Sequence, residues 1–234
     1  MKPLMLSSSI AALLFSVTAH ASPFTGEAEL GWISTSGNSK TDSLNIKAKG
    51  EKTYGKIKHH LTGEVLNSSS AEATTAERYL LGYKADYTVT DKGYVFLSLN
   101  YEKDRFSGYD QRTNELLGYG RQFHDNETLK TRAELSVGAR QSKLDDGGSS
   151  ENEMVVKVQG NLEWTVSETA LFSQDVAVEV GDDSTISKSI TGLKVNINSS
   201  LAMKLTYTVK HTSEVPDGVK KLDSERVATI VYSF

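Results

Sequence analysis

The sequence predicts an all-β protein, a single transmembrane antiparallel β-barrel of about 12 strands with its N- and C-termini on the periplasmic side. Three observations lead to this fold class. Apolar and polar residues alternate with a period of two along most of the chain, as in strands with one face in lipid and the other in water. Residues 1–21 have the features of an export signal. The last alternating segment ends on the aromatic residue Phe234.

The export signal has three recognisable parts. Lys2 is its one charged residue, an apolar run covers 10–17, and the small-residue site Ala19-His20-Ala21 follows. This pattern predicts a secretory signal peptide, residues 1–21, that is cleaved before Ser22. The apolar run is far shorter than the ~20 residues of a spanning helix. We therefore expect residues 22–234 to form one outer-membrane β-barrel domain.

Composition narrows the class of protein further. The mean hydropathy is −0.38 and no later stretch resembles a spanning helix, which excludes a helical membrane protein but not a barrel. The chain has no cysteine, so an exported form has no disulfide framework. The formal net charge of −4 argues against nucleic acid as a partner.

The N-terminal half contains six predicted strands, most with one apolar and one polar face. Turns at 54–56 and 91–93 and longer polar loops at 67–77 and 103–112 separate some of them. In chain order the strands are 24–34, with Leu30 and Trp32 opposite Glu27 and Glu29; 42–52, with Leu44 and Ile46 opposite Lys47 and Lys49; 57–66, with Leu61 and Val65 opposite Lys58 and Glu64; 78–90, with Leu81 and Tyr83 opposite Arg78 and Lys84; 94–102, with Leu97 and Leu99 outward; and 113–123, where Leu116 and Leu117 compete for the outward face.

The C-terminal half contains six more strands. Loops at 142–153, 181–185 and 212–221 and turns near 124–126, 166–169 and 198–200 bound them. An even number of strands places both termini on the same side of the membrane. In chain order the strands are 128–141, with Leu135 and Val137 opposite Arg132 and Glu134; 154–166; 170–180; 186–198; 201–213, with Leu205 and Tyr207 opposite Lys204 and Lys210; and 222–234, with Ile230 and Tyr232 opposite Thr229 and Ser233.

Alternation also occurs in soluble β-sandwiches. The positions of the outward aromatic residues decide between a sandwich and a membrane barrel. Aromatic girdles at both ends of an apolar band are typical of interfacial anchoring, whereas a sandwich core concentrates aromatic residues in mid-strand. The predicted girdle lies near turns, loops or chain ends and comprises Phe24, Trp32, Tyr79, Tyr87, Tyr101, Phe123, Trp164, Phe172, Tyr232 and Phe234.

The inward face carries charges of both signs. A wet or internally paired lumen tolerates them, while an Arg or Lys on the lipid face costs ~2–4 kcal/mol at mid-bilayer. One interpretation is a pore with charged rings, and the other is a narrow barrel filled by its own ion pairs. The near balance of signs predicts no preference between anions and cations. The expected lumen-lining charges include Glu27, Glu29, Lys47, Lys49, Arg78, Lys84, Asp86, Lys130, Arg132, Glu134, Arg140, Lys204 and Lys210.

One pair of residues raises the question of catalysis. His211 and Ser213 share a strand face near the outer rim, where they could act as base and nucleophile of a lipid hydrolase. No orienting Asn or Asp can be assigned, so a non-enzymatic rim histidine is the simpler interpretation. His59 and His60 face opposite ways and cannot chelate one metal. No spacing for a metal or cofactor motif is present, and we expect neither a metal nor a cofactor.

Several motifs resemble a known family. The segments Gly26–Trp32, 35–39, Asp104–Arg112 and Gly118-Tyr119-Gly120 are similar to the domain of unknown function 481 family, whose members are labelled YdiY-like, salt-induced outer membrane proteins. The resemblance covers essentially the whole mature chain. It implies a barrel in the Gram-negative outer membrane, and it transfers no functional residue because the family has no established activity.

These observations leave three hypotheses for function. The first is a small passive diffusion channel or stress-associated (osmotic or acid) envelope barrel, the second a closed structural or binding barrel, and the third the lipid hydrolase. Expected partners are outer-membrane lipid, lipopolysaccharide and the barrel-assembly machinery. The terminal strand, with Ile230, Tyr232 and Phe234, resembles the signal that this machinery reads.

Overall fold

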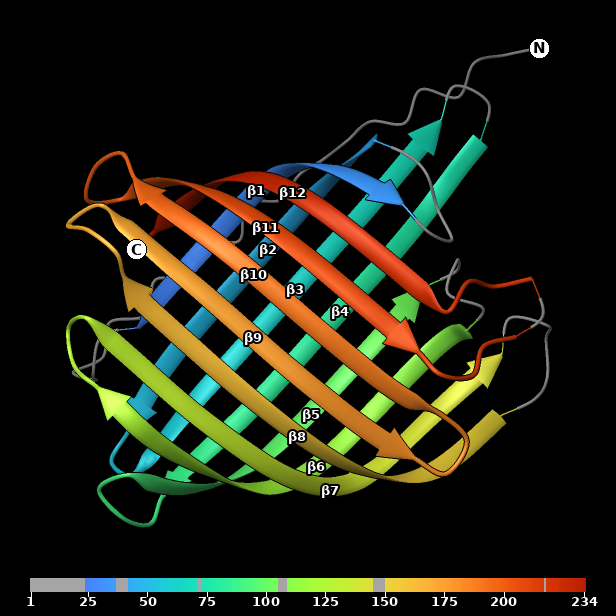
Figure 1. Ribbon diagram of the computed structural model, residues 1–234, viewed down its shortest axis with the longest axis horizontal. Helices are drawn as coiled ribbons and strands as arrows, with labels where there is room; N and C mark the ends of the chain where they lie inside the picture. Colours follow the sequence, from blue (N-terminus) through green and yellow to red (C-terminus); the bar gives the residue numbers. More distant parts are fainter. Residues whose placement is uncertain (1–23, 37–41, 71–72, 105–108, 145–149, 217) are drawn as a thin grey trace.

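The computed structural model describes residues 24–36, 42–70, 73–104, 109–144, 150–216 and 218–234. Each strand pairs in antiparallel fashion with its neighbours in sequence, and β1 also pairs with β12, so the sheet closes into a twelve-stranded barrel (Figure 1). This confirms the predicted all-β antiparallel barrel of twelve strands. The strands are β1 (Thr25–Ser36), β2 (Asp42–Tyr54), β3 (Ile57–Ser70), β4 (Ala73–Thr88), β5 (Gly93–Asp104), β6 (Tyr109–Asp125), β7 (Leu129–Leu144), β8 (Ser150–Thr165), β9 (Ala170–Gly181), β10 (Thr185–Asn196), β11 (Leu201–Thr212) and β12 (Leu222–Ser233).

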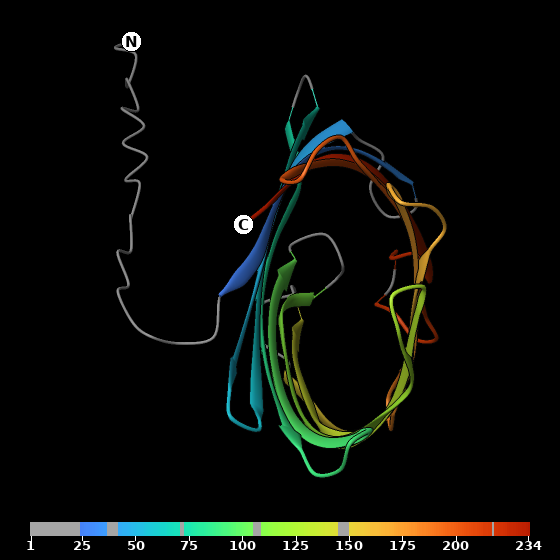
Figure 2. The ribbon, with the colours of Figure 1, turned by 90° about the vertical axis from the view of Figure 1, so that its left-hand side faces the viewer.

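The alternation sorts side chains onto the two faces of the wall. Figure 2 shows this wall curving into an oval ring. Successive side chains of a strand point to opposite faces of the sheet. In β6 the sequence left open which of two adjacent leucines faces outward. Leu117 lies on the outer face and is 63% exposed, whereas Leu116 lies on the inner face and is 2% exposed. The described residues contain no helix long and apolar enough to cross a membrane.

The seam of the barrel lies between the first and last strands. Gly26 N–H donates to the Phe234 carbonyl at 2.9 Å, and Phe234 N–H donates to the Gly26 carbonyl at 3.0 Å. The rings of Phe24 and Phe234 approach to 6.0 Å between centroids. Because closure leaves no unpaired strand edge, the terminal strand is an integral part of the wall.

The sequence interpretation was wrong about three connections. The segments 67–77, 103–112 and 142–153, expected as loops, are largely strand. In the first hairpin β3 continues to Ser70 and β4 begins at Ala73, with the two residues paired. In the others β5 runs to Asp104, β6 begins at Tyr109, β7 runs to Leu144 and β8 begins at Ser150. Polar residues there indicate contact with water, and they do not end the backbone ladder, which continues beyond the apolar band.

The two ends of the barrel differ. We call the end that carries Thr25, Ser233 and the five connections near residues 55, 91, 127, 168 and 198 the turn end. The opposite end, which carries the other six connections, is the loop end. At the turn end the connections are tight: Val89 and Thr90 N–H groups both donate to the Gly93 carbonyl. Gly55 in another of them has φ of 56°, a conformation that favours glycine.

Candidate functional site

Two cavities occupy the barrel interior. The larger, about 480 Å³, is lined mainly by β9–β12, β1 and the loop-end halves of β2–β6. Its lining includes Leu171 and Lys194 near the turn end and Asp104 and Arg112 near the loop end. We call it the passage, because its walls include residues near both ends of the barrel.

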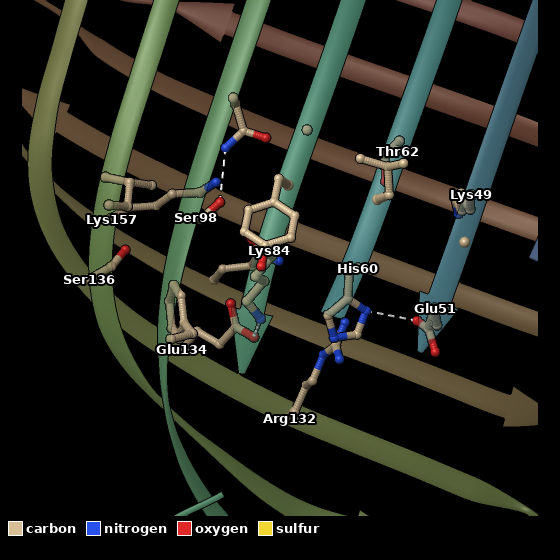
Figure 3. A pocket seen from close by; sticks show the side chains of 18 residues that line it. Lys49, Glu51, His60, Thr62, Lys84, Ser98, Arg132, Glu134, Ser136 and Lys157 are labelled. Carbon is tan, nitrogen blue, oxygen red and sulfur yellow. Dashed lines mark hydrogen bonds and ion pairs between the residues drawn. The ribbon is translucent and has the colours of Figure 1, made fainter. Parts of the chain in front are cut away.

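The smaller cavity, about 310 Å³, lies against β2–β8 and we call it the chamber (Figure 3). Lys49, Asn100 and Lys157 line both cavities. The chamber therefore adjoins the passage at these three side chains, which come from β2, β5 and β8.

Ion pairs neutralise much of the charge in the passage. Glu64 binds Arg78 at 2.6 Å and Lys47 at 3.7 Å. Arg78 also binds Glu225 at 3.3 Å, a contact between β4 and β12 that skips the three strands between them. Ion pairs in a wet lumen hold side chains in place more than they add stability. This one narrows the passage toward the loop end.

A second group of ion pairs joins β10 and β11 to β1. Lys194 binds Glu27 at 2.6 Å, and Lys204 binds Glu29 at 2.9 Å. Lys194 and Lys204 are direct cross-strand neighbours, and like charges in this position repel. The carboxylates of β1 offset that repulsion, so both lysines remain beside the passage in a paired state.

The densest ion cluster is buried in the barrel beside the passage, which its member Glu179 lines. Arg140 has no exposed surface. Its guanidinium binds Glu153 at 2.6 Å and Glu179 at 2.8 Å, and its Nη2 donates to the Ser184 carbonyl and hydroxyl at 2.8 Å each. We call these four residues the Arg140 cluster. It fastens β7, β8 and β9 to the connection between β9 and β10, and it fills that side of the barrel.

The chamber has its own paired charges near the turn end. Lys84 binds Glu134 at 2.5 Å and Asp86 at 3.2 Å. His60 bridges two carboxylates, with Nδ1 2.9 Å from Glu51 and Nε2 3.0 Å from Asp86. Figure 3 shows His60, Glu51, Lys84 and Glu134 around the cavity. This network holds the turn-end part of the chamber wall in a fixed arrangement.

The structure places the lining charges expected from the sequence in three environments. Asp86 is buried beside Lys84, Arg140 lies in its cluster, and Lys130 is exposed near the turn end and lines neither cavity. The remainder line the passage, the chamber or both: Glu27, Glu29, Lys47, Lys49, Arg78, Lys84, Arg132, Glu134, Lys204 and Lys210.

Sequence reasoning missed other lining charges, two of which lie on 186–198, a predicted strand whose facing was not assigned. On β10 the apolar Ile186 and Ile190 line the passage, while the polar Ser189 and Thr191 bind Gln174 of β9. The expected polarity of the two faces is therefore partly reversed there. Counting every second residue back from Lys194 would have placed Lys188 inside. The missed charges are Glu102, Asp104, Arg112, Lys188, Lys194, Asp223 and Glu225.

His211 and Ser213 lie at the loop end of β11. The Ser213 hydroxyl accepts a hydrogen bond from Thr185 N–H at 2.8 Å, and no hydrogen bond joins it to the exposed His211 within the described segments. His59 pairs instead with the Tyr83 hydroxyl at 2.8 Å, on the face opposite to His60. No group of three or more His, Asp or Glu suited to a metal ion occurs among the described residues.

The aromatic residues of the predicted girdle lie mostly on the outer face. The side chain of Trp32 lies outside the described part of the structure, and Phe172 is half-buried. The terminal strand contributes Tyr232 and Phe234, whose rings stack at 6.0 Å between centroids. The girdle residues that are exposed are Phe24, Tyr79, Tyr87, Tyr101, Phe123, Trp164, Tyr232 and Phe234.

Comparisons with known proteins extend this description. A family model described as "Protein of unknown function, DUF481" matches residues 28–234. The "Uncharacterized protein YdiY" of Escherichia coli (strain K12) is 30% identical over 204 residues, which cover 87% of this chain and 80% of YdiY. These matches agree with the motifs that resembled the family.

Solved structures give the same fold at low identity. The NanC porin has a TM-score of 0.59 at 10% identity and covers 88% of this chain and 98% of its own. The translocator domain of autotransporter NalP from Neisseria meningitidis has a TM-score of 0.55 at 15% identity, with 91% and 89% covered. The KdgM porin has a TM-score of 0.51 at 12% identity, with 89% and 99% covered. The barrel thus resembles outer-membrane porins in architecture.

Proposed function

The chain belongs to the DUF481 family of proteins of unknown function, and we propose that it is a passive diffusion channel of the outer membrane for small hydrophilic solutes. The observation that carries this proposal is the passage, whose lining includes residues near both ends of the barrel. Its charged side chains suit a water-filled lumen. The likeness to porins supports a role as a channel.

The proposed location follows from the same features. An exposed apolar outer face, aromatic residues around it and the likeness to porins support insertion in the outer membrane. The predicted signal peptide supplies export, and the even strand count supports a periplasmic turn end. In this arrangement lipid and lipopolysaccharide surround the wall, and the barrel-assembly machinery receives the terminal strand.

Conductance in a planar lipid bilayer tests the proposal. The full mature chain is expected to give discrete current steps. Ala177→Trp places a large ring in the passage, which Ala177 lines, and should lower the step size severalfold. Val178→Trp is the matched control, because the neighbouring Val178 is exposed on the outer face, and its steps should be unchanged. A folded protein without steps at any voltage would overturn the proposal.

One observation favours a closed barrel as the second candidate. The Arg78–Glu225 contact joins strands that are not neighbours and so restricts the passage. Glu225→Ala separates the candidates: in an open channel it should enlarge the existing steps, while in a sealed barrel it should create steps that the unmodified chain lacks.

A further inference from the structure

The chamber contains more positive than negative side chains. Its lining includes four basic side chains, Lys49, Lys84, Arg132 and Lys157, and two carboxylates, Glu51 and Glu134. His60 also lines it. Both carboxylates are engaged, since Glu51 binds Lys58 at 2.6 Å and Glu134 binds Lys84 at 2.5 Å. The chamber therefore differs from the passage, where lining charges of the two signs are nearly equal in number.

Three of these cations have no carboxylate within ion-pair distance among the described residues: Lys49, Arg132 and Lys157. The acids opposite the two lysines are already engaged. Glu27 pairs in register with Lys49 but binds Lys194. Glu179 pairs in register with Lys157 but binds Arg140.

Arg132 makes a different kind of contact. Its Nε donates to the neutral Asn161 amide oxygen at 3.1 Å, which leaves its other N–H groups to face the cavity. An anion that enters the chamber would meet these three cations without displacing a carboxylate.

Neutral hydrogen-bonding side chains complete the lining. They are Thr62, Ser98, Asn100, Ser136 and Gln159. Their hydroxyls and amides can both donate and accept. Asn100 already donates to Ser98 at 3.0 Å, which orients that pair. Figure 3 shows Lys157 and Ser98 on one side of the cavity and Arg132, His60 and Thr62 on another. Such a set suits several hydroxyl groups around one negative charge.

We propose that the chamber is a binding site for a hydroxylated organic anion of about the size of one sugar acid. The electrostatic field of Lys49, Arg132 and Lys157, which surround the cavity, attracts its carboxylate, and its hydroxyls contact the neutral side chains. The volume of about 310 Å³ falls at the lower end of ligand pockets. The ligand enters from the passage past Lys49, Asn100 and Lys157, so this inference rests on the proposed function.

Calorimetry with glucuronate, glucose and acetate as probes tests the site on the full mature chain folded in detergent. Glucuronate should bind more tightly than glucose, which lacks the charge, and than acetate, which lacks the hydroxyls. Arg132→Gln and Lys157→Gln should each weaken glucuronate binding roughly tenfold, because each removes one of the positive charges that attract the anion into the chamber. Lys157→Arg should keep most of the binding.

Lys130→Gln is the matched control. Lys130 lies on the same strand as Arg132 but lines neither cavity, so its replacement should leave binding unchanged. Gly82→Leu is a second test of the site. Gly82 lines the chamber, so a leucine side chain there occupies the cavity and should weaken glucuronate binding. A heat-dependent shift in gel migration checks that each variant is folded.

The outcomes separate the two proposals. Glucuronate binding without conductance would keep the chamber and remove the channel. Conductance with no glucuronate binding, or with equal binding of glucuronate and glucose, would overturn the chamber and keep the channel. Binding that survives both Arg132→Gln and Lys157→Gln would also overturn the assignment.

Discussion

Arg132 and Arg140 lie on the same strand, β7, and both point into the barrel, yet their surroundings differ. Arg140 is fully buried and bound to Glu153, Glu179 and Ser184. Arg132 lines the chamber and has one neutral partner, Asn161. A buried charge needs complete compensation, whereas a charge in a wet cavity does not. The comparison assigns a structural role to the first arginine and a role in solute contact to the second.

Removing each guanidinium is the strongest test of this contrast. Arg140→Met leaves the buried carboxylates of Glu153 and Glu179 without their cation, so it should lower the free energy of unfolding by about 3–5 kcal/mol. Arg132→Met should cost less than about 1 kcal/mol, because its site is open to water. Urea unfolding of the barrel in lipid vesicles measures both. Equal losses for the two variants would remove the distinction.

The contrast between the two arginines was only partly visible in the sequence. Alternation along 128–141 placed both side chains inside, and both were expected to line the lumen. Alternation gives the face of a strand, but it does not give the distance to a carboxylate on another strand. Glu179 meets Arg140 only because β8 and β9 stack beside β7 in a particular register. Such contacts depend on the tilt and stagger of the whole barrel.

Closure itself could be predicted because each signal was local. Period-two alternation, the tight turns and the terminal aromatic strand each involve few neighbouring residues, and together they gave the barrel and its twelve strands. Strand ends were less predictable, since β3 and β4 continue through polar residues to Ser70 and Ala73. The polar side chains of these residues indicate contact with water, but the strand ends where backbone hydrogen bonding to its neighbour ends.

A smaller change within the Arg140 cluster, Glu153→Gln, tests its structural role. Glu153 also accepts hydrogen bonds from Asp183 N–H at 3.0 Å and Ser184 N–H at 3.4 Å, so it anchors the connection between β9 and β10. Glu153→Gln should cost about 2 kcal/mol, because a charged acceptor of these bonds is lost. Amide hydrogen exchange at Asp183 and Ser184 should accelerate. Glu134→Gln in the chamber is the control, and it should leave exchange at this connection unchanged.

Ionic strength should distinguish the two arginines by the smallest effect. Salt screens the charges of the chamber, whereas it leaves the ion pairs of the Arg140 cluster almost unaffected. The Debye length falls from about 10 Å at 0.1 M salt to about 3 Å at 1 M, so exposed charges are screened strongly at high salt. Buried ion pairs are screened much less. We expect reversal potentials in potassium chloride gradients to show a preference for chloride at low salt that declines toward none at high salt. The double variant Arg132→Gln/Lys157→Gln should show little preference at either concentration. The urea midpoint of the unmodified barrel should stay nearly constant over the same range. A midpoint that fell steeply with salt would mean that water reaches Arg140, and the two arginines would then belong to one environment.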